Sequence, residues 1–450
     1  MRLSPEEIAA ALGAEVLAEG SQGPPRRATI DSAETGPGDL FFGLRGEHRD
    51  GGEFAPAAIE AGAWGVVVSR AHTDKLSPHT GDNLQVAWVF AVEDQLAAMQ
   101  ALARAWRQAL GARVLGITGS VGKTSVKDIA RALLPGRVHA NRENLNTEIG
   151  LPLTILEAPD DSETLVLEMA MRGRGQIAEL AAIAEPEVAV ITNVGPVHVE
   201  LLGSVEAIAA AKAEILDDLP PGGTAVAPVE AGELEPHLER APRQLRFGPG
   251  GDVEAVEAKV DDGVTEALIL TPAGEQVFHF PFTEGHNLTN ALAAVAAGVA
   301  LGADLAGMAD RAASIGFSRF RGERMELPGE IVLVNDCYNA NPVSMRAALD
   351  HLASLGAPRT VAVLGEMGEL GPGAPDYHRE VGGHARAHGI DLVIGVGLPA
   401  RDYDPDELVA DPGEAAELLA ARLEPGDAVL VKGSRSAGLE AVAEQLVELV

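Results

Sequence analysis

Hydrophobic and polar positions alternate along the chain in a pattern that predicts strands followed by helices. Near the N-terminus, the apolar runs DLFFGL and WGVVVS flank the helical segment FAPAAIEAGA, a pattern typical of a small mixed α/β domain. Asp94 precedes the amphipathic run QLAAMQALARAWRQAL, which stops at Gly111. Because Asp is a favoured helix N-cap and Gly is favoured just after a helix, we predict a helix here and a domain boundary near residue 111.

The middle of the chain continues this alternation. Strands are predicted at Arg113–Thr118, Thr164–Met169 and Val188–Asn193, and a helix at Ser125–Leu134. Strands separated by helices form parallel sheets, so we predict a parallel sheet covered by helices. The uncharged, Ala-rich run Asn287–Ala303 is interrupted by Asn, Thr and Gly, which favours a buried helix over a membrane span.

After about residue 314 a second alternation predicts a doubly wound domain of its own. Its predicted strands are Ile331–Asn335, Val361–Leu364, Leu392–Val396 and Ala428–Lys432, and its predicted helices are Pro342–Ser354, Pro375–His388, Gly413–Arg422 and Ala437–Leu449. The chain has 450 residues, and at roughly 150 residues per domain about three domains are expected. We therefore predict an α/β protein with a small mixed domain at 1–111, a central parallel-sheet domain at 112–313 and a Rossmann-like domain at 314–450.

Composition and charge narrow the classes of function. Hydrophobic residues make up 46% and charged residues 22%, as in ordinary globular proteins. The 34 Lys and Arg residues face 67 Asp and Glu residues, and the net charge of −33 would repel nucleic acid. Small phosphates are still possible ligands, because a few local cations and backbone N–H groups can outweigh the net charge inside a cleft.

The N-terminus and the cysteine content bear on the compartment. The segment MRLSPEEIAAALG has acidic residues where a signal peptide has an apolar core, and it predicts a helix capped by Ser4 with Pro5 at its first position. The single cysteine, Cys337, has no partner for an intramolecular disulfide, and we interpret it as a packing residue rather than a nucleophile. We expect a cytoplasmic protein with no membrane insertion.

The strongest local motif is ITGSVGKTS, between a predicted strand and a predicted helix. Backbone N–H groups and the helix N-terminus of such a loop cradle phosphates, the lysine reaches the β and γ phosphates, and the hydroxyl after it holds Mg²⁺. The spacing is tighter than in the general phosphate loop, which has Gly where this chain has Ile117. A Gly-rich turn without a ligand is the alternative, but the strand–loop–helix context favours ATP, with candidate contacts at Gly119, Ser120, Val121, Gly122, Lys123, Thr124 and Ser125.

Two more polar residues follow strands of the same predicted sheet. Glu168 ends TLVLEM, and His198 lies in the loop after VAVITNV. Because the carboxyl ends of parallel strands share one edge, both should face the phosphate loop. Taken alone, they would be a solvated strand end and a structural histidine; their shared edge with Lys123 favours Mg²⁺ ligation.

Lys212 lies on the apolar face of the helix predicted from SVEAIAAAKAEILDDL. It falls four residues after Ile208, and Ile215 and Leu216 continue the apolar face. The residues alone favour an amine that reaches the helix edge and stays hydrated. The alternative is a buried, neutral amine that reacts with CO₂ to give a carbamate near the metal.

Two further groups could contact a nucleotide. GHNLTN, at the start of the Ala-rich helix, offers Asn287 and Asn290 one turn apart, suited to an adenine edge, although a helix cap is the simpler interpretation. In the last domain, a strand ends at Asp336, and a polar loop follows it. A carboxylate there together with Arg324 could bind ribose and phosphate; the alternative is a surface ion pair.

With these motifs in place, the chain resembles the Mur ligase family over nearly its whole length. The segments that carry the resemblance are DSAETGPGDLFFGLRGEHRDGGEF, GITGSVGKTSVKD, NRENLNTEIGLPLTIL, LEMAMRGRGQIAEL, ITNVGPVHVELLGSVEAIAAAKAEIL, GHNLTNALAA, NDCYNANPVSMRAAL, LGEMGELG and KGSRS. NDCYNANP, LGEMGELG and KGSRS resemble the member that joins UDP-N-acetylmuramoyl-tripeptide to D-alanyl-D-alanine. The resemblance implies a UDP-sugar domain, a central ATPase domain and a C-terminal domain that presents the incoming amine.

The resemblance also implies roles for individual residues. It implies ATP and two Mg²⁺ ions as cofactors, with Thr124, Glu168, His198 and a carbamylated Lys212 as metal ligands, and with Asn287, Asn290, Arg324 and Asp336 as nucleotide contacts. It implies substrate contacts at Asp31, Ser32, Asn144, Asn146, Thr147, Tyr338, Asn339, Asn341, Lys432, Ser434 and Arg435. The chain departs from the family at Ala33, where Arg is frequent, and at Ala170, where Gly is usual.

The activity implied is ATP-dependent amide formation through an acyl phosphate, by a monomer, in peptidoglycan precursor synthesis. Alternatives are another Mur-type or folylpolyglutamate-type ligase, a phosphate-loop ATPase without ligase activity, or a catalytically silent scaffold. A silent copy need not keep Lys123, Thr124, Glu168, His198 and Lys212 together.

Overall fold

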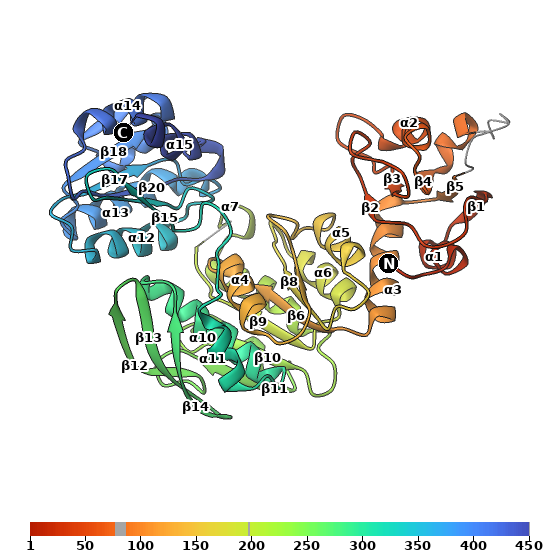
Figure 1. The fold of residues 1–450 in the computed structure, drawn as a ribbon, viewed down its shortest axis with the longest axis horizontal. Coiled ribbons are helices and arrows are strands. Elements are labelled where there is room, and N and C mark those ends of the chain that lie inside the picture. The colour runs from red at the N-terminus through yellow and green to blue at the C-terminus, as the bar shows by residue number, and fades with distance from the viewer. Residues whose placement is uncertain (77–86, 197–198, 450) are drawn as a thin grey trace.

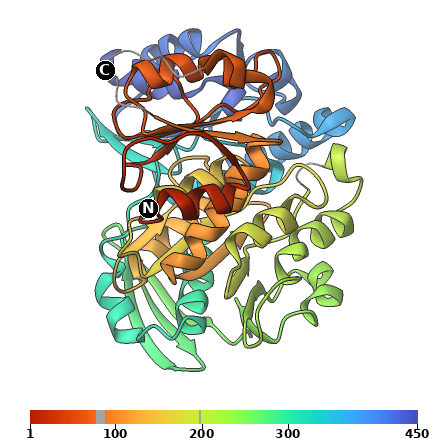
Figure 2. The same cartoon turned by 90° about the vertical axis from the view of Figure 1, so that its right-hand side faces the viewer.

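The computed structural model describes residues 1–76, 87–196 and 199–449. Sheets covered by helices follow one another along the chain, and in Figure 1 the first and last domains lie on either side of the central one. Turned by 90°, both of these domains lie above the central domain (Figure 2). The predicted α/β fold class is confirmed, whereas the boundaries at residues 111 and 313 stay predictions.

The first domain holds a five-stranded sheet in the order β1-β5-β4-β3-β2, parallel except at its β1 edge. Its strands are β1 (Glu15–Ala18), β2 (Ala28–Thr29), β3 (Leu40–Phe42), β4 (Gly65–Ser69) and β5 (Trp88–Val92), and its helices are α1 (Pro5–Leu12), α2 (Ala55–Glu60), α3 (Gln95–Leu110) and the 3₁₀ helices Gly51–Phe54 and Arg70–Leu76. Both predicted helix starts are confirmed: Ser4 caps α1 in a capping box, and the Asp94 side chain accepts a hydrogen bond from Ala97 N. Gly111, in the left-handed conformation, ends α3.

The central domain is built on a six-stranded parallel sheet in the order β11-β10-β9-β6-β8-β7. Its strands are β6 (Arg113–Thr118), β7 (Val138–Ala140), β8 (Thr164–Glu168), β9 (Val188–Ile191), β10 (Thr224–Pro228) and β11 (Arg243–Phe247). Its helices are α4 (Lys123–Leu133), α5 (Gly150–Glu157), α6 (Gln176–Ala184), α7 (Val199–Leu202), α8 (Val205–Lys212), α9 (Glu235–Leu238) and the 3₁₀ helices Ala213–Leu216 and Gly232–Leu234. β6, the strand that leads into the phosphate loop, lies between β8 and β9, so the strand ends that carry polar residues adjoin that loop.

A three-stranded antiparallel sheet follows, and the sequence pattern did not predict it. It comprises β12 (Glu254–Asp261), β13 (Val264–Thr271) and β14 (Gly274–Phe280), and α10 (Gly285–Ala300) and α11 (Leu305–Ala312) come after it. Stacked aromatic rings on β14 and just beyond it share one core with α10 and with the central sheet. The predicted buried helix at Asn287–Ala303 is thus confirmed as α10, and among the described residues no helix has both the length and the apolarity to span a bilayer.

The last domain contains a six-stranded sheet in the order β15-β16-β20-β17-β18-β19, in which only β15 is antiparallel to its neighbour. Its strands are β15 (Glu323–Leu327), β16 (Ile331–Asn335), β17 (Thr360–Leu364), β18 (Leu392–Val396), β19 (Glu407–Val409) and β20 (Ala428–Lys432). Its helices are α12 (Pro342–Ser354), α13 (Ala374–Ala387), α14 (Pro412–Arg422), α15 (Glu440–Leu449) and the 3₁₀ helices Gly371–Gly373, Leu398–Tyr403 and Arg435–Ala437. The last helix begins at Glu440 rather than at the predicted Ala437, because Gly438 adopts a left-handed conformation that no helix continues through.

Candidate functional site

The loop between β6 and α4 depends on two glycines with positive φ. Gly119 (φ 151°) lies against Thr192, and a Cβ at this position would collide with the Thr192 side chain. Gly122 (φ 81°) is the N-cap of α4 and lies against the Asn290 side chain of α10 in the same way. Within the described part of the chain no side chain caps α4, so the N–H groups of its first turn are available to an anion.

Asn193 holds the first half of this loop. Its Oδ1 atom accepts hydrogen bonds from Ser120 N at 3.1 Å and from Val121 N at 2.9 Å. The Ser120 hydroxyl in turn donates to Gly195 O at 3.1 Å. Asn193 follows β9 and was not predicted as a site residue, although a polar residue just after a buried strand is the signal that identified Glu168.

Lys123 lies at the first position of α4 with its ammonium group turned back over the loop. Its Nζ donates to Gly119 O at 2.8 Å. Part of the side chain remains accessible, but burial of the ammonium group lowers the pKa of Lys123; the Glu168 carboxylate opposes this shift, and the Arg321 guanidinium adds to it.

Glu168 is fixed at the end of β8 from two directions. Its Oε2 atom accepts a hydrogen bond from Thr124 Oγ1 at 2.8 Å, and its Oε1 atom accepts one from Asn146 Nδ2 at 2.8 Å. The residue is only 2% exposed. Asn141, another buried residue that was not predicted, accepts from Glu168 N through its Oδ1 atom and so positions the end of the strand.

Lys212 contradicts the expectation that its amine reaches the helix edge. The residue is 2% exposed and lies at the last position of α8. The helix changes to a 3₁₀ turn directly after it, and Ala213, Ile215 and Leu216 in that turn are buried, so the lysine is enclosed on the apolar side. This burial lowers the pKa of Lys212 well below its ordinary value, and the nearby positive charge of Lys123 lowers it further.

The two predicted amides of α10 lie together beside the phosphate loop. Asn290 Nδ2 donates to Asn287 Oδ1 at 3.3 Å, and Asn287 Nδ2 donates to Glu284 Oε2 at 3.3 Å. Asn287 is buried, and Asn290 is the residue that limits the space at Gly122. The pair is therefore not a helix cap, since α10 has no side-chain cap bond.

The last domain brings Tyr338 and Arg321 toward the central site. The Arg321 guanidinium lies over the Tyr338 ring, 4.1 Å from its centroid, and the buried Arg321 Nε has no hydrogen-bond partner among the residues that the structure describes. Burial raises the pKa of the Tyr338 phenol; Arg321 opposes this rise and the charge of Glu168 adds to it, which places this loop within electrostatic reach of the end of β8. Arg321 was not predicted, and no local sequence signal distinguishes it.

A buried ammonium group organises the loop that follows β16. Lys432 is 2% exposed, and its Nζ donates to Asp336 Oδ2 at 2.6 Å and to Asn339 O at 3.1 Å. Ser434 Oγ accepts from Gly368 N at 2.8 Å, which joins a second loop to the same edge. The Asn341 side chain is occupied as the N-cap of α12 through a capping box with Ser344.

Other predicted residues are not drawn into this cluster. Asp31 lies after β2 and accepts from Ala33 N within its own turn, and within residues 1–76, 87–196 and 199–449 no hydrogen bond or ion pair joins Asp31 or Ser32 to another domain. Four more predicted residues are exposed: Asn144, Thr147, Arg324 and Arg435. Among the described residues, no side-chain hydrogen bond or ion pair joins them to Lys123, Glu168 or Asn146, although the Arg435 guanidinium lies 6.0 Å from the centroid of the Tyr338 ring. His198 lies outside the described residues. Cys337 is buried in the last domain's core, and burial raises the pKa of its thiol to about 12.

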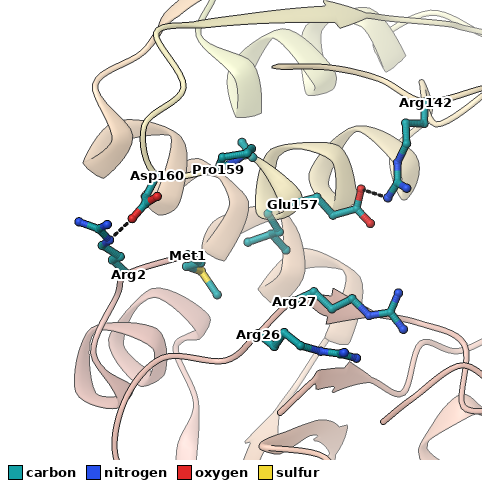
Figure 3. Close-up of a pocket in the computed structure, with 10 residues that line it drawn as sticks. Met1, Arg2, Arg26, Arg27, Arg142, Glu157, Pro159 and Asp160 are labelled. Atoms are coloured by element: carbon teal, nitrogen blue, oxygen red, sulfur yellow. Dashed lines mark hydrogen bonds and ion pairs between the residues drawn. The ribbon is translucent and has the colours of Figure 1, made fainter. Parts of the chain in front are cut away.

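A separate cavity of about 430 Å³ lies between the first and central domains (Figure 3). Arg142 pairs with Glu157 at 2.5 Å on its central-domain side, and Arg2 pairs with Asp160. Arg26 and Arg27 line the opposite side. None of the predicted site residues lines this cavity.

The fold and this edge define an α/β phosphate-loop protein whose last domain reaches the loop. Residues 27–107, 117–298 and 321–435 match, respectively, the models of the Mur ligase family catalytic domain, the Mur ligase middle domain and the Mur ligase glutamate ligase domain. The chain belongs to the Mur ligase family.

Individual proteins show the same similarity. The UDP-N-acetylmuramoyl-tripeptide--D-alanyl-D-alanine ligase of Synechocystis sp. is 40% identical over 429 residues, which cover 91% of this chain and 89% of that protein. The crystal structure of MurF from Acinetobacter baumannii has a TM-score of 0.89 at 27% identity and covers 100% of this chain and 99% of that chain. MurF ligase from Thermotoga maritima in complex with ADP has a TM-score of 0.83 at 31% identity and covers 94% of this chain and 97% of that chain.

Proposed function

We propose that this chain is an ATP-dependent amide ligase that joins D-alanyl-D-alanine to UDP-N-acetylmuramoyl-tripeptide in peptidoglycan precursor synthesis in the cytoplasm. The named substrates of relatives that cover most of the chain support this choice, and ADP in the T. maritima structure supports ATP as the energy source. The observation that carries the proposal is the Glu168 carboxylate, hydrogen bonded to Thr124 at the start of the phosphate-loop helix. Residues 1–111 would hold the UDP-sugar, 112–313 the ATP and 314–450 the incoming dipeptide.

The reaction needs an activated acyl group, because a carboxylate is a poor acylating agent. The terminal carboxylate of the tripeptide attacks the γ-phosphorus of ATP, which releases ADP and leaves an acyl phosphate. The free amine of D-alanyl-D-alanine then attacks the acyl carbon, the C–N bond forms, and phosphate leaves as the amine gives up a proton. Lys123 and the first turn of α4 bind and orient the phosphates, and Arg321 adds positive charge beside them.

Magnesium fits the oxygen atoms present at this edge. Thr124 offers a hydroxyl and Glu168 a carboxylate, both hard ligands of the kind Mg²⁺ prefers. We propose these residues together with His198 as ligands of two ions. Bound Mg²⁺ would neutralise charge on the transferring phosphoryl group.

Lys212 is proposed as a site of carbamylation. Burial lowers the pKa of Lys212 and so raises the neutral share of its amine, and a neutral amine attacks CO₂, forms an N–C bond and loses a proton. The product is a carboxylate-like group close to Lys123. Labelling with ¹³C-bicarbonate should give a carbamate resonance in the wild-type protein and none in Lys212→Arg; the same spectrum for both proteins would rule the modification out.

The remaining contacts are proposed from their places in the fold. Nucleotide contacts are proposed at Asn287, Asn290, Arg324 and Asp336 and at residues 119–125. Substrate contacts are proposed at Asp31, Ser32, Asn144, Asn146, Thr147, Tyr338, Asn339, Asn341, Lys432, Ser434 and Arg435. For Asn341 the contact would use backbone atoms or the remaining amide N–H groups, because its side-chain oxygen caps α12.

The test is ADP release by the purified chain with Mg-ATP, UDP-N-acetylmuramoyl-tripeptide and D-alanyl-D-alanine, omitting each substrate in turn. Mass spectrometry follows the nucleotide-sugar product. We expect ADP only when all three are present, and a product heavier by one dipeptide less water. ADP release without the dipeptide and without a mass gain would indicate a phosphate-loop ATPase instead. Product formation with glutamate or with folate in place of these substrates would favour another ligase of the same fold.

A further inference from the structure

Three side chains on two helices of the last domain converge away from the proposed catalytic edge. Asp350 lies on α12, His384 lies on α13, and His388 follows α13 directly. One ligand atom from each lies within 4.8 Å of the other two. His384 Nε2 is 2.6 Å from Asp350 Oδ1, and His388 Nε2 is 3.5 Å from the same oxygen.

The backbone selects the tautomer that the neutral imidazole of His388 adopts. His388 Nδ1 is 2.9 Å from His384 O, and a carbonyl oxygen can only accept, so Nδ1 carries the proton in this bond. The neutral ring therefore has its Nε2 lone pair free, and that atom faces Asp350. A histidine whose Nδ1–H is held by a backbone carbonyl, leaving Nε2 as a ligand, is the usual arrangement around protein-bound metals.

The distances suit a small tetrahedral ion. Two ligands at about 2.0 Å from such an ion are about 3.3 Å apart, and the separations of 2.6 and 3.5 Å bracket this value. His384 and His388 are four residues apart on adjacent turns, with rings stacked at 4.0 Å, so both reach one point from the same helix face.

The surroundings favour a cation. The cluster lies at the C-terminal ends of both helices, where the helix dipoles are negative. One turn earlier on each helix, Arg346 and Glu380 pair at 2.6 Å and so neutralise one another. Since α12 and α13 start at the carboxyl edge of the sheet, their C-terminal ends lie at the opposite edge from Asp336.

We propose that Asp350, His384 and His388 form a binding site for a zinc-type divalent ion, with a fourth position left for water. Two imidazoles and one carboxylate select Zn²⁺, Co²⁺, Ni²⁺ or Cu²⁺ over Mg²⁺. The ion ties α12 to α13 and stabilises the last domain. This site is independent of the proposed ligase activity, because none of its residues is part of the phosphate-loop edge.

The test is a Zn²⁺ titration of the full chain after EDTA treatment, by isothermal calorimetry in millimolar Mg²⁺ to occupy the proposed catalytic ions. Thermal unfolding with and without Zn²⁺ provides a second readout, and Co²⁺ absorption reports tetrahedral geometry. We expect one Zn²⁺ per chain and a higher Tm with zinc. His388→Ala and Asp350→Asn should each weaken binding by at least about tenfold and abolish the Tm shift.

His279→Ala is the matched control. His279 is an exposed histidine that pairs with Glu266 at 3.0 Å, and it lies on β14 in another domain, so its loss should leave zinc binding unchanged. Circular dichroism of each variant without zinc checks that it folds. Zinc binding of wild-type affinity and stoichiometry in both His388→Ala and Asp350→Asn would overturn the proposal, as would a wild-type chain that binds no zinc at micromolar concentration.

Discussion

Thr124 Oγ1 donates a hydrogen bond to Glu168 Oε2 at 2.8 Å and so joins the first turn of α4 to the end of β8. The other carboxylate oxygen is held by Asn146, from the loop after β7. Three separate segments of the chain therefore place one buried negative charge near Lys123. This charge raises the pKa of Lys123 and so opposes the lowering that burial causes. The cost of burying this carboxylate is offset by its hydrogen bonds.

Replacement of this carboxylate by an amide should separate catalysis from folding. In Glu168→Gln the amide oxygen can still accept from Thr124, but the negative charge is lost. We expect kcat to fall by about 10²–10³-fold, with a Tm within about 4 °C of the wild type. Steady-state kinetics measures kcat, and calorimetry measures the Tm. Activity within threefold of the wild type would show that the charge of Glu168 has no part in the reaction.

The glycine at the start of α4 should not tolerate a side chain. Gly122→Ala would place a Cβ against Asn290 in a left-handed backbone conformation. We expect a loss of about 1–2 kcal/mol in the free energy of unfolding and a higher KM for ATP. Gly232→Ala is the control, because a Cβ there meets nothing within 4 Å and no positive φ is involved. Equal effects of the two substitutions would contradict this account.

The buried ammonium group of Lys432 should be needed for stability. Lys432→Met keeps an unbranched apolar chain as far as Cε but leaves the Asp336 carboxylate without its 2.6 Å partner. We expect the free energy of unfolding to fall by about 2–4 kcal/mol. This loss is at the lower end of the range for breaking a buried ion pair, because Asp336 is partly exposed. Urea denaturation measures it. The double variant Lys432→Met, Asp336→Asn should recover part of the loss, and no recovery would indicate that packing rather than charge is at stake.

Acidification should weaken the contact between the last and central domains. His351 is buried 3.5 Å from Glu284 Oε1, and burial lowers its pKa from the ordinary 6.5; Arg324 adds to this shift, while Glu284 and Asp336 oppose it. Below pH 6.5 the unfolded chain therefore binds a proton that the folded chain does not. The stability contribution of neutral His351 is complete above that pH and is lost as the pH falls toward the folded pKa.

The difference in unfolding free energy between wild type and His351→Gln, measured from pH 7.5 to 5.5, reports His351 together with His286, because the charge of His351 lowers the pKa of His286. We expect the wild type to lose more stability than the variant over this interval. Parallel pH profiles would contradict the assignment.

Much of the fold could be predicted because strands buried on both faces read as short apolar runs between helices. β6, β16, β18, β20 and α12 coincide with their predicted bounds. The sheet β12–β14 was not predicted, because β12 is an edge strand with most of its side chains exposed. In β13 the buried positions include Thr265 and Thr271 while Val264 and Leu270 are exposed, so its apolar residues do not follow its burial. β15 was missed for a similar reason, since it carries four polar or partly exposed positions before Leu327.

The site was predicted where a polar residue ends a buried strand, as at Glu168. Asn141 and Asn193 also follow strands of this sheet, but Asn193 holds the phosphate loop and Asn141 holds the end of β8, and amides at strand ends are too common to single out. The expectation that the Lys212 amine reaches the helix edge was wrong, because an apolar stripe does not reveal whether a neighbouring segment covers the amine. Arg321 meets Tyr338 only through tertiary packing.

The most direct test of the ligase account uses UDP-N-acetylmuramoyl-tripeptide labelled with ¹⁸O in its terminal carboxylate, incubated with Mg-ATP, D-alanyl-D-alanine and the enzyme. If an acyl phosphate forms, one ¹⁸O atom passes from the carboxylate into the phosphate released with each amide bond, and the peptide product keeps the other. Phosphate free of ¹⁸O, released at the rate of ADP formation, would mean that water attacks ATP, and it would contradict the account.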